Sequence, residues 1–209
     1  GDAKCAVFGR CGGCSLQHTS VKMQQAIKKG SVEEQLVHAG FADVKVGYED
    51  GPEYGYRRKA RLSIRYNKKH NSIWMGFRHI HLPRVIVDIA ACPVLVPALS
   101  AGLPAIKKAI AALQIADKIP QVELMELQGQ CSVTIRHLAP LIDEDKKILM
   151  ALADELQWSV FIQPKGLSST ELLRGPDGQG DTFTVRYERY SMAIGVHDFV
   201  QVNEAINNK

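Results

Sequence analysis

Four cysteines are the residues whose types and spacing most directly indicate chemistry in this sequence. Cys5, Cys11 and Cys14 stand together in the string CAVFGRCGGC, and Cys92 follows 78 residues later in DIAACPVL. Thiolates are soft metal ligands, and a triplet with one remote cysteine supplies four of them. The C-x5-C-x2-C spacing with a distant fourth cysteine is closer to iron–sulfur ligation than to structural zinc, which is usually held by two short pairs.

An alternative interpretation makes these cysteines ordinary thiols, because free cysteine is often buried as a small hydrophobe. Cys131 also competes with Cys92 for the fourth position, although its apolar strand pattern with Val133 and Ile135 favours a core role. The first thirty residues lack the apolar core of a signal peptide. A cytoplasmic, reducing location is therefore expected, where clustered cysteines indicate metal binding rather than disulfides.

A basic segment between Arg57 and Arg84 is the second chemical signal. It holds nine Lys or Arg residues and no Asp or Glu, in a chain whose net charge is only +4. Such a segment neutralises phosphates, and its aromatic residues, among them Trp74, can stack on unpaired bases or belong to the core. The alternative is a solvated strand face that guards a sheet edge. The candidate RNA-binding residues are Arg57, Arg58, Lys59, Arg61, Arg65, Lys68, Lys69 and Arg78.

The elements that must position these residues are indicated by hydrophobic periodicity. Ser20 is a candidate N-cap for a helix that runs to His38, with Gly40 as its stop. Alternating patterns over 59–66, 72–78 and 84–89 predict an antiparallel meander. Pro93 opens a helical stretch that Pro97 and Pro104 interrupt. Further on we expect a hairpin of 121–127 and 131–137, a helix capped by Asp143, a strand over 158–163, a loop over 174–181, and strands over 182–187 and 191–194.

Together these patterns predict an α+β fold, with a mostly antiparallel sheet, flanking helices and an N-terminal Cys-rich iron–sulfur loop. We expect three parts: a cluster-binding segment and helix over 1–40, a central RNA-binding domain over 41–197, and the start of a further domain over 198–209. The final string VNEAINNK reads as the first turn of a helix, so we expect a fragment. No apolar run is long enough to span a membrane.

An ordered series of motifs resembles the 5-methyluridine RNA methyltransferases, the RumA/TrmA family, and within it the members that act on 23S rRNA. The motifs span essentially the whole chain: CAVFGRCGGCSLQH at 5–18, YGYRRKARLSIRY at 54–66, MGFR at 75–78, VDIAACPVLVP at 87–97 and DFVQVN at 198–203.

The resemblance implies a 4Fe-4S cluster held by Cys5, Cys11, Cys14 and Cys92. It also implies S-adenosylmethionine as methyl donor, with Gln201 contacting this cofactor or the target uridine. Family members use a cysteine nucleophile that adds to the uracil ring, and the resemblance places that cysteine in a methyltransferase domain beyond this chain.

The function expected from the sequence is therefore the iron–sulfur and RNA-binding part of an RNA uracil-5-methyltransferase, inactive by itself. We expect 23S rRNA as its partner, no membrane association and a monomer. Two alternatives stay open. One is a stand-alone iron–sulfur electron carrier, and the other is a zinc-binding nucleic-acid adaptor.

Overall fold

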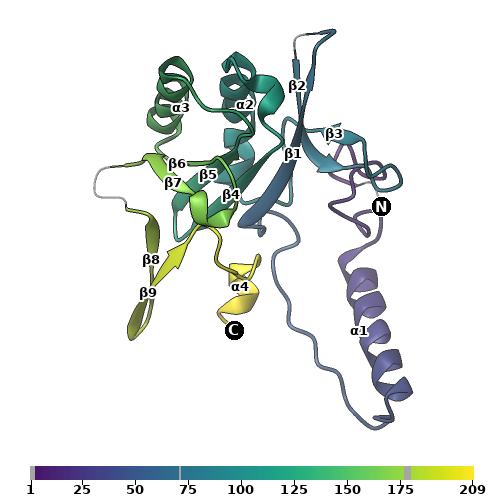
Figure 1. Cartoon of the computed structure of the whole chain (residues 1–209). Helices are drawn as coiled ribbons and strands as arrows, with labels where there is room; N and C mark the ends of the chain where they lie inside the picture. Colours follow the sequence, from purple (N-terminus) through teal and green to yellow (C-terminus); the bar gives the residue numbers. More distant parts are fainter. Residues whose placement is uncertain (1–2, 71, 177–179) are drawn as a thin grey trace.

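A seven-stranded sheet organises the chain, whose computed structural model describes residues 3–70, 72–176 and 180–209 (Figure 1). Its strand order is β3-β2-β1-β4-β5-β6-β7, and every neighbouring pair is antiparallel except β5–β6. A separate hairpin joins β8 to β9. The elements in order are α1 (Val21–His38), β1 (Lys59–Asn67), β2 (Ser72–Arg78), β3 (Ile86–Asp88), α2 (Pro97–Ala112), η1 (Ala116–Lys118), β4 (Gln121–Leu127), β5 (Gln130–Arg136), α3 (Asp143–Leu156), β6 (Ser159–Gln163), η2 (Leu167–Ser169), β7 (Glu171–Arg174), β8 (Thr182–Tyr187), β9 (Tyr190–Gly195) and α4 (Glu204–Asn207).

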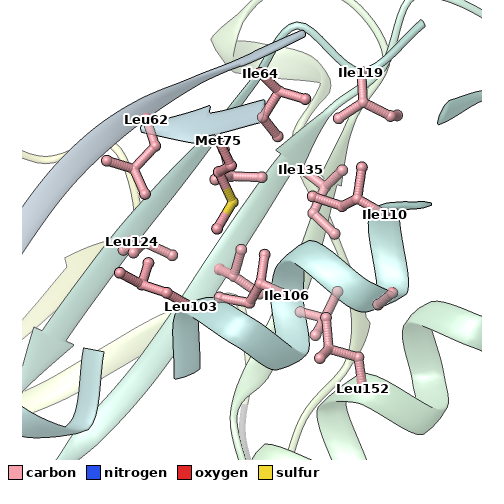
Figure 2. Close-up of a cluster of buried hydrophobic side chains, with 14 of the residues drawn as sticks. Leu62, Ile64, Met75, Leu103, Ile106, Ile110, Ile119, Leu124, Ile135 and Leu152 are labelled. Atoms are coloured by element: carbon pink, nitrogen blue, oxygen red, sulfur yellow. The ribbon is translucent and has the colours of Figure 1, made fainter. Parts of the chain in front are cut away.

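Helices α2 and α3 cover one face of this sheet. Strand β1 sends Leu62 and Ile64 towards that face, and both are buried. They meet the apolar side of α2, from which Leu103 and Ile106 are fully buried (Figure 2). A side-chain period of 2 in the strands and of 3.6 in the helices produces these matching apolar surfaces.

The β8–β9 hairpin covers part of the opposite face of the sheet, and the rest of that face is exposed to solvent. Met125, Leu127 and Phe161 point to this side and form a second apolar cluster with Phe183 and Val185 of the hairpin. The turn between β4 and β5 holds the hairpin through one side chain. The Gln128 amide donates to the Arg186 carbonyl at 2.7 Å and accepts from the Arg186 N–H at 2.9 Å, as a neighbouring strand would. The hairpin is therefore fixed to the sheet.

The N-terminal loop and α1 lie beside the β2–β3 edge of the sheet, and α1 extends away from the body (Figure 1). The loop pairs with the end of β2, since the Gly12 N–H donates to the Arg78 carbonyl at 2.9 Å and the Ile80 N–H to the Arg10 carbonyl at 2.8 Å. A Cβ at Gly12 would lie 2.9 Å from that carbonyl oxygen, so only glycine allows this approach.

The structure confirms the α+β class, the mostly antiparallel sheet, the first helix with its Ser20 cap, the meander and the central hairpin. Several details were wrong. Pro97 rather than Pro93 begins α2, because the first helical position needs no N–H donor, and Pro104 lies inside the helix without interrupting it. Ile142 rather than Asp143 is the N-cap of α3. Strand β7 was missed inside the stretch before the expected loop, whose residues 177–179 lie outside the described part. In the described ranges, no helix combines the length and hydropathy that crossing a bilayer requires.

Candidate functional site

A small pocket at the β2–β3 edge of the sheet is lined by four of the five cysteines. The N-terminal loop brings Cys5, Cys11 and Cys14 to it, and the segment after β3 brings Cys92. The fifth, Cys131, is buried in the main core, as the strand pattern predicted. The fold thus brings the four cysteines predicted from the sequence to one pocket and places Cys131, the alternative fourth cysteine, in the main core.

Electrostatic coupling among these thiols reflects their proximity. Burial raises the pKa of Cys11 above its ordinary value, and negative charge on Cys14, Cys5 or Cys92 raises it further. The Gly13 N–H opposes this rise by donating to the Cys11 sulfur at 3.4 Å. Four thiols that line one pocket are a typical soft-metal donor set, because a bound cation balances the negative charge of thiolate ligands.

The pocket itself is narrow. Its volume is about 20 Å³, which holds about one water molecule. Within residues 3–70, 72–176 and 180–209, no group of three or more cysteine, histidine or carboxylate side chains is arranged to hold a metal ion. Four thiols are the donor type that an iron–sulfur cluster takes, although the pocket as it stands is smaller than such a cluster.

The segment 198–203 forms the second part of the site, and the start of β1 holds it in place. The Arg58 N–H donates to the Val202 carbonyl, and its guanidinium donates to the Gln201 carbonyl at 2.7 Å. The Lys59 ammonium donates to the carbonyls of Val196 at 3.1 Å and Asp198 at 2.6 Å. Desolvation lowers the pKa of Lys59. The side chains of two predicted RNA-binding residues, Arg58 and Lys59, therefore donate to carbonyls in or just before this segment.

We call these hydrogen bonds from Arg58 and Lys59 to the segment the clamp. The clamped segment presents two side chains towards solvent. Phe199 is 85% exposed, and Gln201 is exposed as well. Both line a pocket of 760 Å³ between the segment, α4 and the β8–β9 hairpin. Phe199 also lines a neighbouring pocket of 420 Å³ that contains Lys59, Arg61 and His197. An exposed aromatic ring between two pockets is suited to stacking against a planar ligand.

The other basic residues are distributed over the solvent-facing side of β1 and β2. Arg61 and Arg65 alternate with buried neighbours on β1, and Arg65 lies opposite Trp74 on β2. Trp74 is 38% exposed, so it belongs to this surface rather than to the core. Lys68 and Lys69 are exposed in the turn, and Arg78 is exposed at the end of β2. Arg57 is half-buried against Phe77 beside the cysteine pocket.

Arg58 lies apart from this surface, because its side chain is only 2% exposed and pairs with Glu204 at 2.8 Å. Two polar residues near Arg61 were missed from the sequence. Glu123 forms an ion pair with Arg61 at 2.9 Å, and His197 bonds Thr170 at 2.7 Å. No local sequence motif marks either residue. Glu123 lies beside Arg61 because β1 pairs with β4, which the sequence does not indicate.

Comparison with known proteins identifies relatives along nearly the whole chain. A 23S rRNA (uracil(1939)-C(5))-methyltransferase RlmD from Cupriavidus pinatubonensis is 35% identical over 205 residues, or 97% of this chain and 44% of that protein. The enzyme of the same name from Azoarcus sp. is 35% identical over 98% of this chain and 47% of its own length. The chain thus spans less than half the length of these relatives. No family model matches.

A solved structure shares the fold. The tRNA (uracil-54, C5)-methyltransferase of Pyrococcus abyssi, solved in complex with S-adenosyl-L-homocysteine, superposes with a TM-score of 0.66 at 20% identity. The match covers 98% of this chain and 50% of that one.

These matches correct the function expected from the sequence. The expected role as an inactive iron–sulfur and RNA-binding part is wrong, because the aligned 97% of this chain matches proteins named as methyltransferases and the structural neighbour was solved with S-adenosyl-L-homocysteine. The same matches leave no support for a stand-alone electron carrier or a zinc adaptor. The motif resemblance itself is confirmed, since along nearly its whole length this chain is similar to proteins named as 23S rRNA uracil-5-methyltransferases.

Proposed function

We propose that this protein functions in S-adenosylmethionine-dependent methylation of uracil C5 in RNA, with 23S rRNA as the substrate. The observation that carries the proposal is the clamped segment 198–203, which presents Phe199 and Gln201 to the 760 Å³ pocket beside a basic sheet face. The names of the relatives support the reaction and the rRNA.

The chain's own residues divide the work in this proposal. The Gln201 amide donates to or accepts from the cofactor or the target base, and the Phe199 ring stacks on one of their planar groups. The sheet face with Arg61, Arg65 and Trp74 binds the flanking phosphates and an unpaired base. Cys131 takes no part as a nucleophile, because burial raises its pKa to about 12.

The first test measures binding of S-adenosyl-L-homocysteine by calorimetry and transfer of labelled methyl to a 23S rRNA transcript. We expect Gln201→Ala to weaken binding about tenfold, the value of one hydrogen bond of average strength. Gln114→Ala is the matched control, since that side chain is exposed at the end of α2 and lies outside the pocket. Equal binding by both variants would remove Gln201 from the proposal, and no binding by the unmodified protein would refute it.

A second test addresses the basic face. Each phosphate contact contributes about one unit to the slope of binding affinity against salt concentration on logarithmic axes. Arg65→Gln is expected to reduce that slope by about one for an rRNA transcript. Arg174→Gln is the control, because Arg174 is also exposed but lies at the far edge of the sheet and pairs with Asp154. An unchanged slope for Arg65→Gln would place the RNA elsewhere.

We also propose that Cys5, Cys11, Cys14 and Cys92 hold a 4Fe-4S cluster. Their convergence on one pocket supports this assignment, as does the donor set of four thiols. Cys5, Cys11 and Cys14 from the N-terminal loop and Cys92 from the segment after β3 would hold the cluster, which would supply iron–thiolate bonds that link these two segments.

Iron content after anaerobic reconstitution tests this assignment. Cys92→Ala should lose the iron and the visible absorbance, and should lower the melting temperature of the reconstituted protein. Cys131→Ala is the matched control, since it removes a cysteine that lies in the main core and away from the pocket. Retention of iron and of the melting temperature in Cys92→Ala would refute the assignment.

A further inference from the structure

The side-chain amide of Gln17 is buried without a partner beside the cysteine pocket. Neither its Nε2 nor its Oε1 has a hydrogen-bond partner of acceptable distance and angle among the described residues, and both atoms are inaccessible to solvent. An amide in this state costs about 1 to 3 kcal/mol, so native proteins rarely retain one without a reason.

Gln17 lies where two pockets meet. It lines the pocket of the four cysteines together with Cys14, and it also lines an adjacent pocket of 250 Å³. Cys14 lines this second pocket as well. The donor that lacks a partner thus lies in the same two pockets as the Cys14 sulfur.

The state of that sulfur decides how much the contact contributes. A neutral thiol is a weak acceptor, whereas a thiolate bound to a metal carries negative charge and accepts amide N–H groups well. The Gly13 N–H already donates to the Cys11 sulfur in the same way. The loop therefore offers one donor to each of two neighbouring sulfurs.

We propose that Gln17 is a positioning residue of the cysteine site, whose side-chain N–H donates to the Cys14 sulfur when that sulfur is a metal-bound thiolate. This inference rests on the proposed cluster. It gives a partner to a buried amide that has none among the described residues. The hydrogen bond orients the Cys14 ligand and makes a bound cluster easier to reduce, because hydrogen bonds to the sulfurs set such potentials.

Two variants distinguish this role from simple packing. Gln17→Leu keeps most of the volume and removes the donor, while Gln17→Glu places an acceptor and a negative charge beside the sulfur. The matched control is Gln24→Leu, because Gln24 lies in the same 250 Å³ pocket and its amide donates to the Thr19 carbonyl instead. All proteins are reconstituted anaerobically with iron and sulfide.

The measurements are the rate of iron loss to a chelator, the midpoint potential, and the melting temperature of the metal-free protein. For Gln17→Leu we expect iron loss about ten times faster and a lower potential, since partners of metal ligands typically contribute 10- to 100-fold to affinity. The metal-free variant should melt at the same or a higher temperature, because it no longer buries an unpaired amide. Gln17→Glu should lose iron faster still.

The outcomes separate this inference from the proposed cluster. An unmodified protein that takes up no iron refutes the cluster, and the inference with it. A loaded protein whose rate and potential are unchanged in Gln17→Leu refutes the inference alone. A metal-free Gln17→Leu protein that melts lower, with unchanged potential when loaded, assigns Gln17 a packing role and also overturns the inference.

Discussion

Replacement of Arg58 by leucine tests how the segment 198–203 is held. Arg58 is almost completely buried, yet it donates from Nε to the Gln201 carbonyl at 2.7 Å and from Nη1 to Glu204 at 2.8 Å. Its backbone also bonds Val202 and Glu126, and these bonds survive the substitution. The change therefore removes only the side-chain part of the clamp.

The expected loss follows from those two contacts. Hydrogen bonds from a charged donor contribute about 1.5 to 3 kcal/mol each. The carboxylate of Glu204 is 34% exposed, so water replaces much of what that group loses. The Gln201 carbonyl loses its charged partner, and leucine refills part of the volume. We expect Arg58→Leu to lower the free energy of unfolding by about 2 to 4 kcal/mol.

Urea unfolding measures the total, and amide hydrogen exchange locates it. Protection should fall chiefly in residues 198–207, because α4 and the preceding segment depend on this side chain. Arg65→Leu, in the strand β1 that follows Arg58, is the control, and being exposed it should change stability by about 0.5 kcal/mol or less. A loss below that value for Arg58→Leu, with exchange in the segment unaltered, would contradict the clamp.

Three further predictions concern the frame around the site. Gly76→Ala places a Cβ 2.0 Å from the Val87 carbonyl oxygen, so β2 and β3 must separate, and urea unfolding should show a loss of about 3 kcal/mol or more; a loss under 1 kcal/mol would mean that the strands shift freely. Cys131 has a pKa of about 12 instead of 9.0, so the folded protein holds its proton while the unfolded chain releases it. Stability should therefore fall as the pH rises above 9, and alkylation of this thiol at neutral pH should be about a thousandfold slower than in urea; comparable rates would show that the thiol is open to solvent. Asp145→Ala removes the acceptor of the Gln114 N–H at 2.7 Å and should cost about 1 to 3 kcal/mol by thermal unfolding, whereas an unchanged melting temperature would show that water replaces it.

The sheet was largely predictable because its strands carry local signals. Lys59–Asn67 alternates buried and accessible residues as the sequence alternates apolar and polar ones. The parallel pairing of β5 with β6 had no such signal, since it depends on α3 returning the chain to the sheet. Strand β7 is short and only half-buried, so its pattern is weak.

The grouping of Cys5, Cys11 and Cys14 was predictable from their spacing, whereas the division of the basic segment was not. Arg58 and Arg61 look equivalent in the string RRKAR, but one is buried against Gln201 and the other is exposed and paired with Glu123. Burial of Arg58 depends on a segment about 140 residues away in the sequence. Likewise, the unpaired Gln17 amide follows from the packing of the loop and from no local motif.

The two parts of the site are joined through residues 55–59. On one side, the N–H groups of Gly55 and Arg57 donate to the carbonyls of Pro93 and Val94, directly after Cys92. On the other, Arg58 bonds the segment that carries Gln201. The Arg57 side chain lines both the cysteine pocket and the pocket beside Phe199. Hydrogen bonds thus connect the segment that follows Cys92 to residues 55–58, and Arg58 connects these residues to the segment that carries Phe199 and Gln201.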